Sequence, residues 1–413
     1  MVKLVHKRDG VFITVVIKGV MALLCVIALS TSLYAFADVS DVRFGGNMSK
    51  SRVVIDVSKG VMPKVFMLAD PYRVVIDLPN AKWSAKQKHK PAGLISSFRH
   101  GLFQPKVYRI VLDLKRPAVI AKTFTLPPKG KYGNRVVIDL TSTSRVNFIA
   151  AVDKSRKARV KNRPRVKYAQ PNLKSPKSRN RGSKRVITID AGHGGIDPGT
   201  LGRYGKNEDD LTLLMSREIK RQLEETRRYK VILTRSSDVY IEHRRRYEIG
   251  RKFGSDLFIS IHVDSVSNPK TRGGSVYTLS ERSSDKEAAR LAARENKSDL
   301  IAGVDLDKTD NDVSGILIEL AQRETMNYSA RFAEVLVGSM RKNVRMLKTG
   351  HRYASLMVLK APDMPSVLIE TGFQTNRQDA KVLNSRSGRS KIARGIVQGV
   401  DNYFNSVINV ASR

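Results

Sequence analysis

Residues 185–195 of this 413-residue chain have the sequence RVITIDAGHGG. The first five residues are rich in β-branched side chains, which is typical of a buried strand. The strand runs into a loop that holds three glycines, which allow a sharp turn, and His193. A histidine at the carboxyl end of such a strand stands where open α/β sheets build their sites. A lone histidine is more often a hydrogen-bonded structural residue, so its meaning depends on the residues downstream.

From residue 185 onward, strand patterns alternate with segments in which apolar residues recur at helical spacing. Further strands are predicted at 230–234, 257–261, 275–278 and 366–369, and helices at 209–226, 241–253, 285–298, 313–344 and 386–406. This alternation predicts an α/β domain at residues 185–408, in which a mostly parallel sheet is flanked by helices on both faces.

Residues 38–148 carry a repeated strand pattern, in which an Arg or another polar residue precedes β-branched residues and an Asp stands before a closing apolar residue. The pattern occurs at 52–57, 72–78, 107–114 and 134–140. Turn residues such as Pro71 and Gly130 separate the copies. We therefore predict a small all-β sandwich that contains no catalytic cluster.

The next segment, residues 149–184, is dense in lysine and arginine and contains Pro164, Pro171 and Pro176. Because it holds too few apolar residues to form a core, we predict a basic disordered linker. The linker is either a solvated tether or a segment that contacts an anionic surface of the cell envelope.

The N-terminus predicts export. Residues 1–37 combine a basic start, an apolar core at 20–29 and the sequence Ala35-Phe36-Ala37, which is typical of a signal-peptide cleavage site. The apolar run is shorter than the roughly 20 residues that a membrane span requires, so we expect cleavage after Ala37 and a periplasmic location. The only cysteine, Cys25, lies in this segment, and the mature chain therefore has neither disulfides nor thiolate chemistry.

The formal net charge of +37 predicts an anionic partner, which is nucleic acid, anionic lipid or an anionic polymer. Charge alone does not choose among these three. Export argues against nucleic acid and in favour of an anionic polymer of the envelope.

Four polar residues lie at or near strand ends in the α/β domain. His193 follows the first strand, His262 follows the strand at 257–261, and Glu370 ends the last strand, while Glu208 begins a predicted helix. The carboxyl ends of parallel strands lie at one edge of a sheet, so we expect the four side chains to meet there.

Two histidines and a carboxylate are the open ligand set of a hydrolytic zinc site, in which water takes the fourth position. Zinc lowers the pKa of that water to about 7. A further carboxylate must accept the proton and pass it to the leaving amine. Glu370 suits this role, because its apolar strand partly desolvates the carboxyl group and raises its pKa.

The segments that contain these residues resemble the signatures of the zinc-dependent N-acetylmuramoyl-L-alanine amidases of type 3. The matching stretches are DAGHGG at 190–195, EDDLTL at 208–213, SIHVD at 260–264 and VLIETGF at 367–373. The repeated VVID of the β-rich part is similar to the AMIN domain, an envelope-targeting module found ahead of peptidoglycan amidases.

The resemblance implies hydrolysis of the amide between N-acetylmuramic acid and L-alanine of the stem peptide. It implies one Zn²⁺ per catalytic domain, held by His193, Glu208 and His262, with Glu370 as the catalytic glutamate. Val263 stands where the family usually has Ala, and the stretch around His351 also departs from the family pattern. These departures bear on substrate contacts and not on the metal.

Amidases of the cell-separation branch resemble one another in an insertion that plugs the zinc site. Residues 285–328 are longer than a minimal crossover and correspond to it by position. Glu295 resembles the glutamate that binds zinc in the plugged state, and Glu319 and Glu324 are weaker candidates. The resemblance thus implies an autoinhibited enzyme that acts in cell separation and answers to a protein activator. An ordinary surface helix is the alternative.

Two other histidines are assigned lesser roles. His243 lies among three arginines on a predicted helix and is expected to be solvated, and His351, in a basic loop, is expected at the surface or in contact with substrate.

Other functions remain open at this point. A zinc carboxypeptidase or endopeptidase would act on peptides of the same polymer with the same ligands. A non-catalytic envelope-binding protein could keep the fold, although the four intact positions argue against it.

Overall fold

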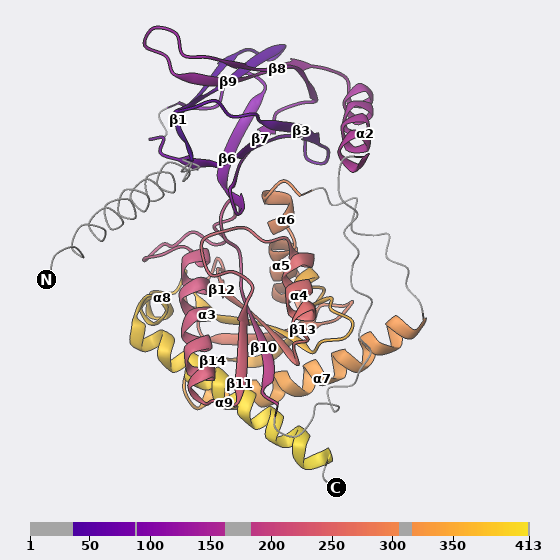
Figure 1. Ribbon diagram of the computed structural model, residues 1–413. Coiled ribbons are helices and arrows are strands. Elements are labelled where there is room, and N and C mark those ends of the chain that lie inside the picture. The colour runs from indigo at the N-terminus through magenta and orange to yellow at the C-terminus, as the bar shows by residue number, and fades with distance from the viewer. Residues whose placement is uncertain (1–35, 87–88, 162–182, 305–315, 412–413) are drawn as a thin grey trace, which may run out of the picture.

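The computed structural model describes residues 36–86, 89–161, 183–304 and 316–411 (Figure 1). The predicted signal peptide up to residue 35 and most of the predicted basic linker lie outside these residues. Ala37, the last residue of the predicted signal peptide, is the first residue of a strand. Within the described part of the chain, no helix is both long and apolar enough to cross a membrane.

The N-terminal part is a sandwich of two antiparallel sheets, apart from one short parallel pair at an edge, and this confirms the all-β prediction. One sheet has the strand order β5-β1-β2-β9-β8 and the other β3-β4-β7-β6. The strands are β1 (Ala37–Gly46), β2 (Lys50–Val57), β3 (Lys64–Leu68), β4 (Arg73–Pro79), β5 (Ala81–Trp83), β6 (Ile95–Gln104), β7 (Val107–Leu114), β8 (Ala118–Leu126) and β9 (Asn134–Ser142). The four predicted strands correspond to β2, β4, β7 and β9, which are all interior strands of their sheets.

The repeated Arg and Asp positions pair across neighbouring strands. In the five-stranded sheet, Nε of Arg52 on β2 lies 2.6 Å from Asp139 on β9. In the four-stranded sheet, Nε of Arg109 on β7 lies 2.6 Å from Asp77 on β4. Side chains alternate between the two faces of a strand. The apolar residues next to each Arg and Asp therefore fill the core, as Val74 and Ile76 do, while the Arg and Asp side chains lie on the outer faces.

The predicted start of the basic linker is wrong, because residues 149–161 continue helix α2 (Arg145–Lys161). Phe148 and Val152 lie one helical turn apart and pack into the sandwich core, and the ring centroid of Phe148 is 5.1 Å from that of Tyr72. The burial of each such side chain contributes roughly 1.5–3 kcal/mol to the free energy of folding. The mean composition of residues 149–184 hid the apolar residues at the start of this segment, Ile149, Ala151 and Val152.

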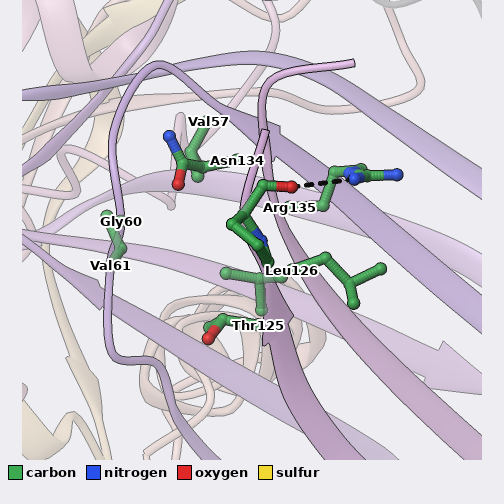
Figure 2. A pocket seen from close by; sticks show the side chains of 9 residues that line it. Val57, Gly60, Val61, Thr125, Leu126, Asn134 and Arg135 are labelled. Carbon is green, nitrogen blue, oxygen red and sulfur yellow. Dashed lines mark hydrogen bonds between the residues drawn. The ribbon is translucent and has the colours of Figure 1, made fainter. Parts of the chain in front are cut away.

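A cavity of about 170 Å³ lies in the sandwich between β2, β8 and β9 (Figure 2). Val57, Val61 and Leu126 line it together with Asn134 and Arg135. None of the predicted site residues belongs to this cavity, so it is separate from the predicted metal site.

The C-terminal part contains a six-stranded sheet with the order β11-β10-β12-β15-β13-β14. Only β13 and β15 pair antiparallel, which confirms the mostly parallel sheet. The strands are β10 (Arg185–Ala191), β11 (Tyr229–Leu233), β12 (Leu257–Asp264), β13 (Gly274–Leu279), β14 (Met346–Ala354) and β15 (Ser366–Phe373). Every residue of β12 and β15 is buried, as expected for central strands covered on both faces.

Helices cover both faces of this sheet (Figure 1). The helices are α3 (Glu208–Glu225), α4 (His243–Lys252), α5 (Lys286–Glu295), α6 (Ser298–Ile301), α7 (Ile316–Arg341), η2 (Met357–Leu359), α8 (Arg377–Asn384) and α9 (Arg386–Ala411). Apolar residues of α3, α7, α8 and α9 pack on one face around Ile259 and Ile369. Residues of α5 and the segment that includes η2 pack on the other face around Phe258 and Leu368.

Candidate metal centre

His193 lies in the tight loop that follows β10, and its backbone has the left-handed conformation, with a φ of 57°. A non-glycine residue adopts this conformation at a cost of about 1 kcal/mol or more. The buried guanidinium of Arg246 holds the loop in place, since it donates to the carbonyl oxygen of His193 at 2.9 Å and to that of Ala191 at 2.7 Å. The same guanidinium pairs with Asp190 of β10.

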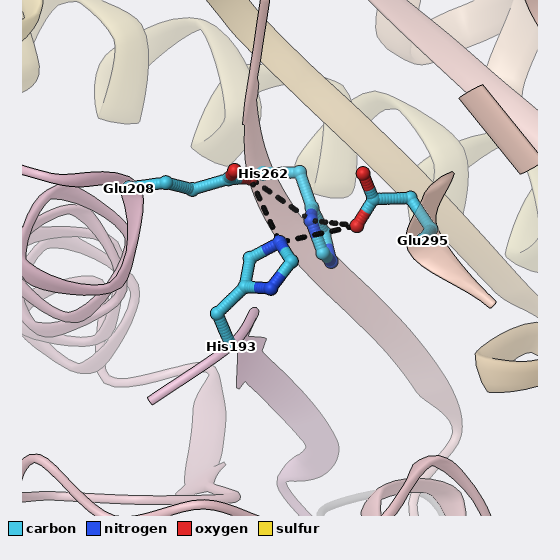
Figure 3. A group of neighbouring side chains, drawn as sticks. All are labelled: His193, Glu208, His262 and Glu295. Carbon is cyan, nitrogen blue, oxygen red and sulfur yellow. Dashed lines mark hydrogen bonds and ion pairs between the residues drawn. The ribbon is translucent and has the colours of Figure 1, made fainter. Parts of the chain in front are cut away.

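The structure brings His193, Glu208 and His262 together and adds Glu295 from the end of α5 (Figure 3). Each residue offers one ligand atom, and these four atoms lie within 4.8 Å of one another. Nε2 of His193 is 3.2 Å from Oε1 of Glu208 and 3.1 Å from Oε2 of Glu295. Nδ1 of His262 is 3.1 Å and 3.0 Å from the same two oxygens. All four residues are buried.

This donor set fits a metal ion. Ligand atoms that surround zinc tetrahedrally at about 2.0–2.1 Å are about 3.3 Å apart, which is close to the four distances between the histidine nitrogens and the carboxylate oxygens. Nε2 of His193 and Oε2 of Glu295 are buried and have no hydrogen-bond partner in the described structure. Buried polar atoms are normally satisfied, so a cation between these side chains would complete their contacts.

The charges of the cluster point the same way. Burial by itself lowers the pKa of the His193 imidazole, but the carboxylates of Glu208, Asp197 and Glu295 together raise this pKa well above its ordinary value. The site therefore attracts positive charge, which a bound divalent cation would supply.

Two glycines leave room for the ligands. A Cβ atom on Gly192 would lie 2.5 Å from the ring of His262. A Cβ atom on Gly199, which has a φ of 63°, would lie 2.7 Å from both Glu208 and His193. Any larger residue at either position would displace a ligand side chain.

Supporting hydrogen bonds orient the ligands. Nδ1 of His193 is 2.8 Å from Oδ2 of Asp197, which leaves Nε2 directed at the centre of the cluster. Ser298, on α6, donates to the same Asp197 oxygen. Backbone amides of Thr200 and Val263 donate to the two oxygens of Glu208, each at 2.9 Å. Such contacts fix the ring orientation and basicity of metal ligands.

Glu370 lies on β15 directly beside His262 of β12 in the strand register. Its side chain is fully buried, and neither carboxylate oxygen has a hydrogen-bond partner among the described residues. Burial raises the pKa of this carboxyl group well above its usual value, and the nearby charges of Asp264, Glu208 and Glu295 raise it further. A carboxyl group with a raised pKa is suited to accept and return a proton.

Arg294 and Glu295 act on the centre from the same helix end. Arg294 pairs with Glu295 at 3.0 Å and with Asp264 at 2.9 Å, and it donates to the carbonyl oxygen of Ser265. Burial raises the pKa of Asp264 to about 6 even though Arg294 opposes the shift. Sequence patterns assign no role to Arg294 or Asp264, although Asp264 follows His262 at the two-residue spacing of one strand face.

The predicted solvation of His243 is wrong. The side chain is buried beneath α5, where Nε2 lies 3.0 Å from the carbonyl oxygen of Glu295. Arg246 lies one turn further along α4 and is also buried, because it pairs with Asp190. Run together in the sequence, these basic residues look like a solvated helix face, and only the tertiary partners reverse that expectation.

The remaining candidates lie elsewhere. His351 is part of β14 and not of a loop, and its Nε2 lies 3.0 Å from the hydroxyl oxygen of Thr278 on β13. Glu324 is exposed on α7 and accepts a hydrogen bond from Tyr328. The side chain of Glu319 and residues 305–315 of the predicted insertion lie outside the described part of the structure.

Comparison with known proteins relates the chain to a family of amidases. The family described as N-acetylmuramoyl-L-alanine amidase matches residues 187–402, and the AMIN domain matches residues 41–140. The chain is 32% identical over 368 residues to the N-acetylmuramoyl-L-alanine amidase AmiC of Neisseria meningitidis serogroup B, which covers 87% of this chain and 88% of the relative. It is 31% identical over 408 residues to AmiC of Escherichia coli O6:H1, with 96% of each chain covered. A solved N-acetylmuramoyl-L-alanine amidase from Clostridium difficile 630 aligns with a TM-score of 0.41 at 23% identity, over 54% of this chain and 98% of the other.

Proposed function

Because the chain belongs to the N-acetylmuramoyl-L-alanine amidase family, we propose that its buried cluster binds one zinc ion and hydrolyses the amide between N-acetylmuramic acid and L-alanine of peptidoglycan. The observation that carries the metal assignment is the set of two histidine nitrogens and two carboxylate oxygens, in which each nitrogen lies 3.0–3.2 Å from both oxygens. Nitrogen and oxygen ligands in this number and arrangement favour zinc.

In the active state His193, Glu208 and His262 hold the zinc. When bound there, zinc acidifies a water molecule and polarises the scissile carbonyl. Asp197 accepts a hydrogen bond from Nδ1 of His193, which favours the tautomer with an unprotonated Nε2 towards the cluster. The backbone amides of Thr200 and Val263 fix the orientation of the Glu208 carboxylate.

Glu370 is the proton carrier of the proposed mechanism. Its carboxylate accepts the proton of the attacking water and delivers it to the nitrogen of L-alanine as the amide bond breaks. The side chain is suited to this role, because it has no hydrogen-bond partner that would hold its proton and it stands beside His262 at the edge of the sheet. Its burial raises the pKa and so stabilises the protonated form that must donate to the leaving amine.

The amidase activity is tested by digesting purified sacculi with the zinc-loaded protein and identifying the products by mass spectrometry. We expect stem peptides with a free amino group on L-alanine, together with glycan strands that keep the lactyl carboxylate. Shortened stems on intact glycan would mean a carboxypeptidase, and opened cross-links would mean an endopeptidase. No soluble product from the zinc-loaded protein, and none from its zinc-loaded Glu295→Ala variant, would support the non-catalytic alternative.

We also propose that the described state is autoinhibited by Glu295. A catalytic zinc site keeps one position open for water, whereas a site with four protein ligands is closed. Glu295 supplies the fourth ligand atom, and its side chain is buried in the centre. Arg294, the preceding residue, forms an ion pair with Asp264. The end of α5 therefore has two effects: Glu295 takes the position of the water, and Arg294 offsets negative charge of the site.

Glu295→Ala should therefore raise basal hydrolysis of labelled sacculi. A segment held by a few kcal/mol keeps the open population near about 1%, so the rise should lie between about tenfold and 100-fold. Zinc content should stay at one per chain, since three ligands remain. Glu287→Ala removes a glutamate from the exposed start of the same helix and is the matched control. Unchanged basal activity of Glu295→Ala would remove this residue as the inhibitor.

The biological setting is proposed on the same grounds. A periplasmic enzyme that remodels the wall at cell separation needs its activity restrained until a protein activator releases it. The basic segment that follows α2, residues 162–184, is proposed to hold the enzyme at anionic surfaces of the envelope through charge.

A further inference from the structure

The outer face of the four-stranded sheet is covered, whereas the outer face of a sandwich usually faces water. Arg73 and Arg109 on this face are only 2% and 4% exposed. The chain segment that follows Glu295 provides this cover together with Ile196 and Tyr240, and Figure 1 shows α6 between the sandwich and the rest of the C-terminal domain. Residues 286–304, which include α5 and α6, are called the inhibitory segment below.

Three arginines of the sandwich bind four successive backbone carbonyls of this segment. Arg73 donates to the carbonyl oxygen of Leu300 at 2.7 Å, and Arg99 donates to that of Ile301 at 2.6 Å. Arg109 donates to the next two, of Ala302 at 2.9 Å and of Gly303 at 3.2 Å. Carbonyls at a helix end lack partners within the helix, and hydrogen bonds from a guanidinium are among the stronger ones.

Apolar contacts reinforce the polar ones. Ala302 is fully buried in a cluster that includes Phe66, Val75 and Val111 of the sandwich. Gly303 has a φ of 67°, and a Cβ atom there would lie 3.0 Å from Val75 and 3.1 Å from Val111. The segment therefore lies directly on the sheet, with no space for a larger side chain.

The same few residues also reach the metal centre. Ser298 donates to Asp197, the partner of His193. Asp299 accepts hydrogen bonds from the hydroxyl group of Tyr240 and from the backbone amide of His243. Withdrawal of Glu295 by movement of the whole segment would thus require the contacts with the sandwich to break as well.

We propose that this sheet face, made of Phe66, Arg73, Val75, Arg99, Arg109 and Val111, is an intramolecular latch that holds the inhibitory segment in the metal centre. The inference rests on the proposed inhibition by Glu295 and adds the N-terminal domain as the part that sets its strength. When the segment leaves, Arg109 still pairs with Asp77 and Arg99 still pairs with Asp113. These two arginines therefore keep an ion-pair partner in the open state, and the latch can reclose. By linkage, a ligand that competes for this face favours the open enzyme.

Two variants weaken the latch from opposite sides in the full-length protein. Arg99→Ala removes the hydrogen bond to Ile301, and Ala302→Lys places a cation among the three arginines. Each has a matched control. Arg52→Ala removes an Arg–Asp pair from the exposed face of the other sheet, and Ala293→Lys adds the same charge to an exposed position of α5.

Basal sacculus hydrolysis and backbone hydrogen exchange are measured on all four variants and on Glu295→Ala. We expect both latch variants to raise basal hydrolysis about tenfold, the effect on an opening equilibrium of losing one hydrogen bond to a charged group. Exchange should quicken at the amides of Ala302, Gly303 and Val304, which are bonded within the segment, and stay unchanged in β12. The two controls should match the unmodified protein in both measurements.

The outcomes separate the latch from the inhibition on which it rests. If Glu295→Ala is activated while both latch variants keep basal hydrolysis and slow exchange, the latch is overturned and the inhibitory role of Glu295 stands. If Glu295→Ala is not activated, the proposed inhibition itself fails, whatever the latch variants show.

Discussion

Replacing either His193 or His262 by alanine is expected to abolish hydrolysis of sacculi and to remove the zinc. Each variant leaves one histidine with Glu208 and, in the closed state, Glu295. A set with a single nitrogen donor falls short of the ligand sets of catalytic zinc sites. The metal contributes several kcal/mol to lowering the barrier, so its loss corresponds to at least about 10³-fold in rate. Elemental analysis of the purified proteins and dye release from labelled sacculi measure the two effects.

His89→Ala is the control for this experiment, because this histidine lies on the sandwich and its side chain is 44% exposed. It should keep one zinc per chain and full activity. If both site variants retained stoichiometric zinc, His193 and His262 would not be its ligands.

Glu370→Gln is expected to lower turnover by about 10²- to 10⁴-fold, the usual contribution of a general acid–base group. Glutamine keeps the size of the side chain but cannot accept the proton of water or return it to the amine. Zinc should stay bound, since Glu370 is not one of the four clustered ligands. The loss should appear in kcat with little change in KM, because the side chain acts on protons and not on substrate binding.

Glu334→Gln, at an exposed position of α7, is the control for loss of a carboxylate elsewhere in the same domain. Turnover of Glu370→Gln close to that of this control would exclude Glu370 from the mechanism. A loss of zinc from Glu370→Gln would instead assign the residue to metal binding.

The centre of the candidate site was predictable because it depends on one general property of parallel sheets. Strands that run the same way end at the same edge, so His193 after β10 and His262 and Glu370 on β12 and β15 converge without further information. The register confirms this convergence, since His262 and Glu370 are direct neighbours. The helical and strand periods likewise predicted most of the C-terminal elements, because burial on a fixed face imposes a period on the sequence.

Sequence patterns failed where burial depends on one distant partner. β14 was missed because its sequence is polar, and β13 stabilises it through pairing at the sheet edge. His243 and Arg246 stand in a run of basic residues, yet both are buried by contacts with Glu295 and Asp190. Composition averages over neighbours in the sequence, whereas burial is decided by neighbours in space.

The sequence by itself thus determined the fold class of both parts and the meeting of His193, Glu208, His262 and Glu370 at the sheet edge, and through resemblance it suggested Glu295 as the candidate inhibitor. Only the tertiary structure decided that the sandwich lies on the segment that carries Glu295. The hydrogen bonds of Arg109 to Ala302 and of Arg73 to Leu300 join residues 193 and 227 positions apart. Such contacts follow no local period, because they join surfaces that are distant in the sequence and exclude water between them.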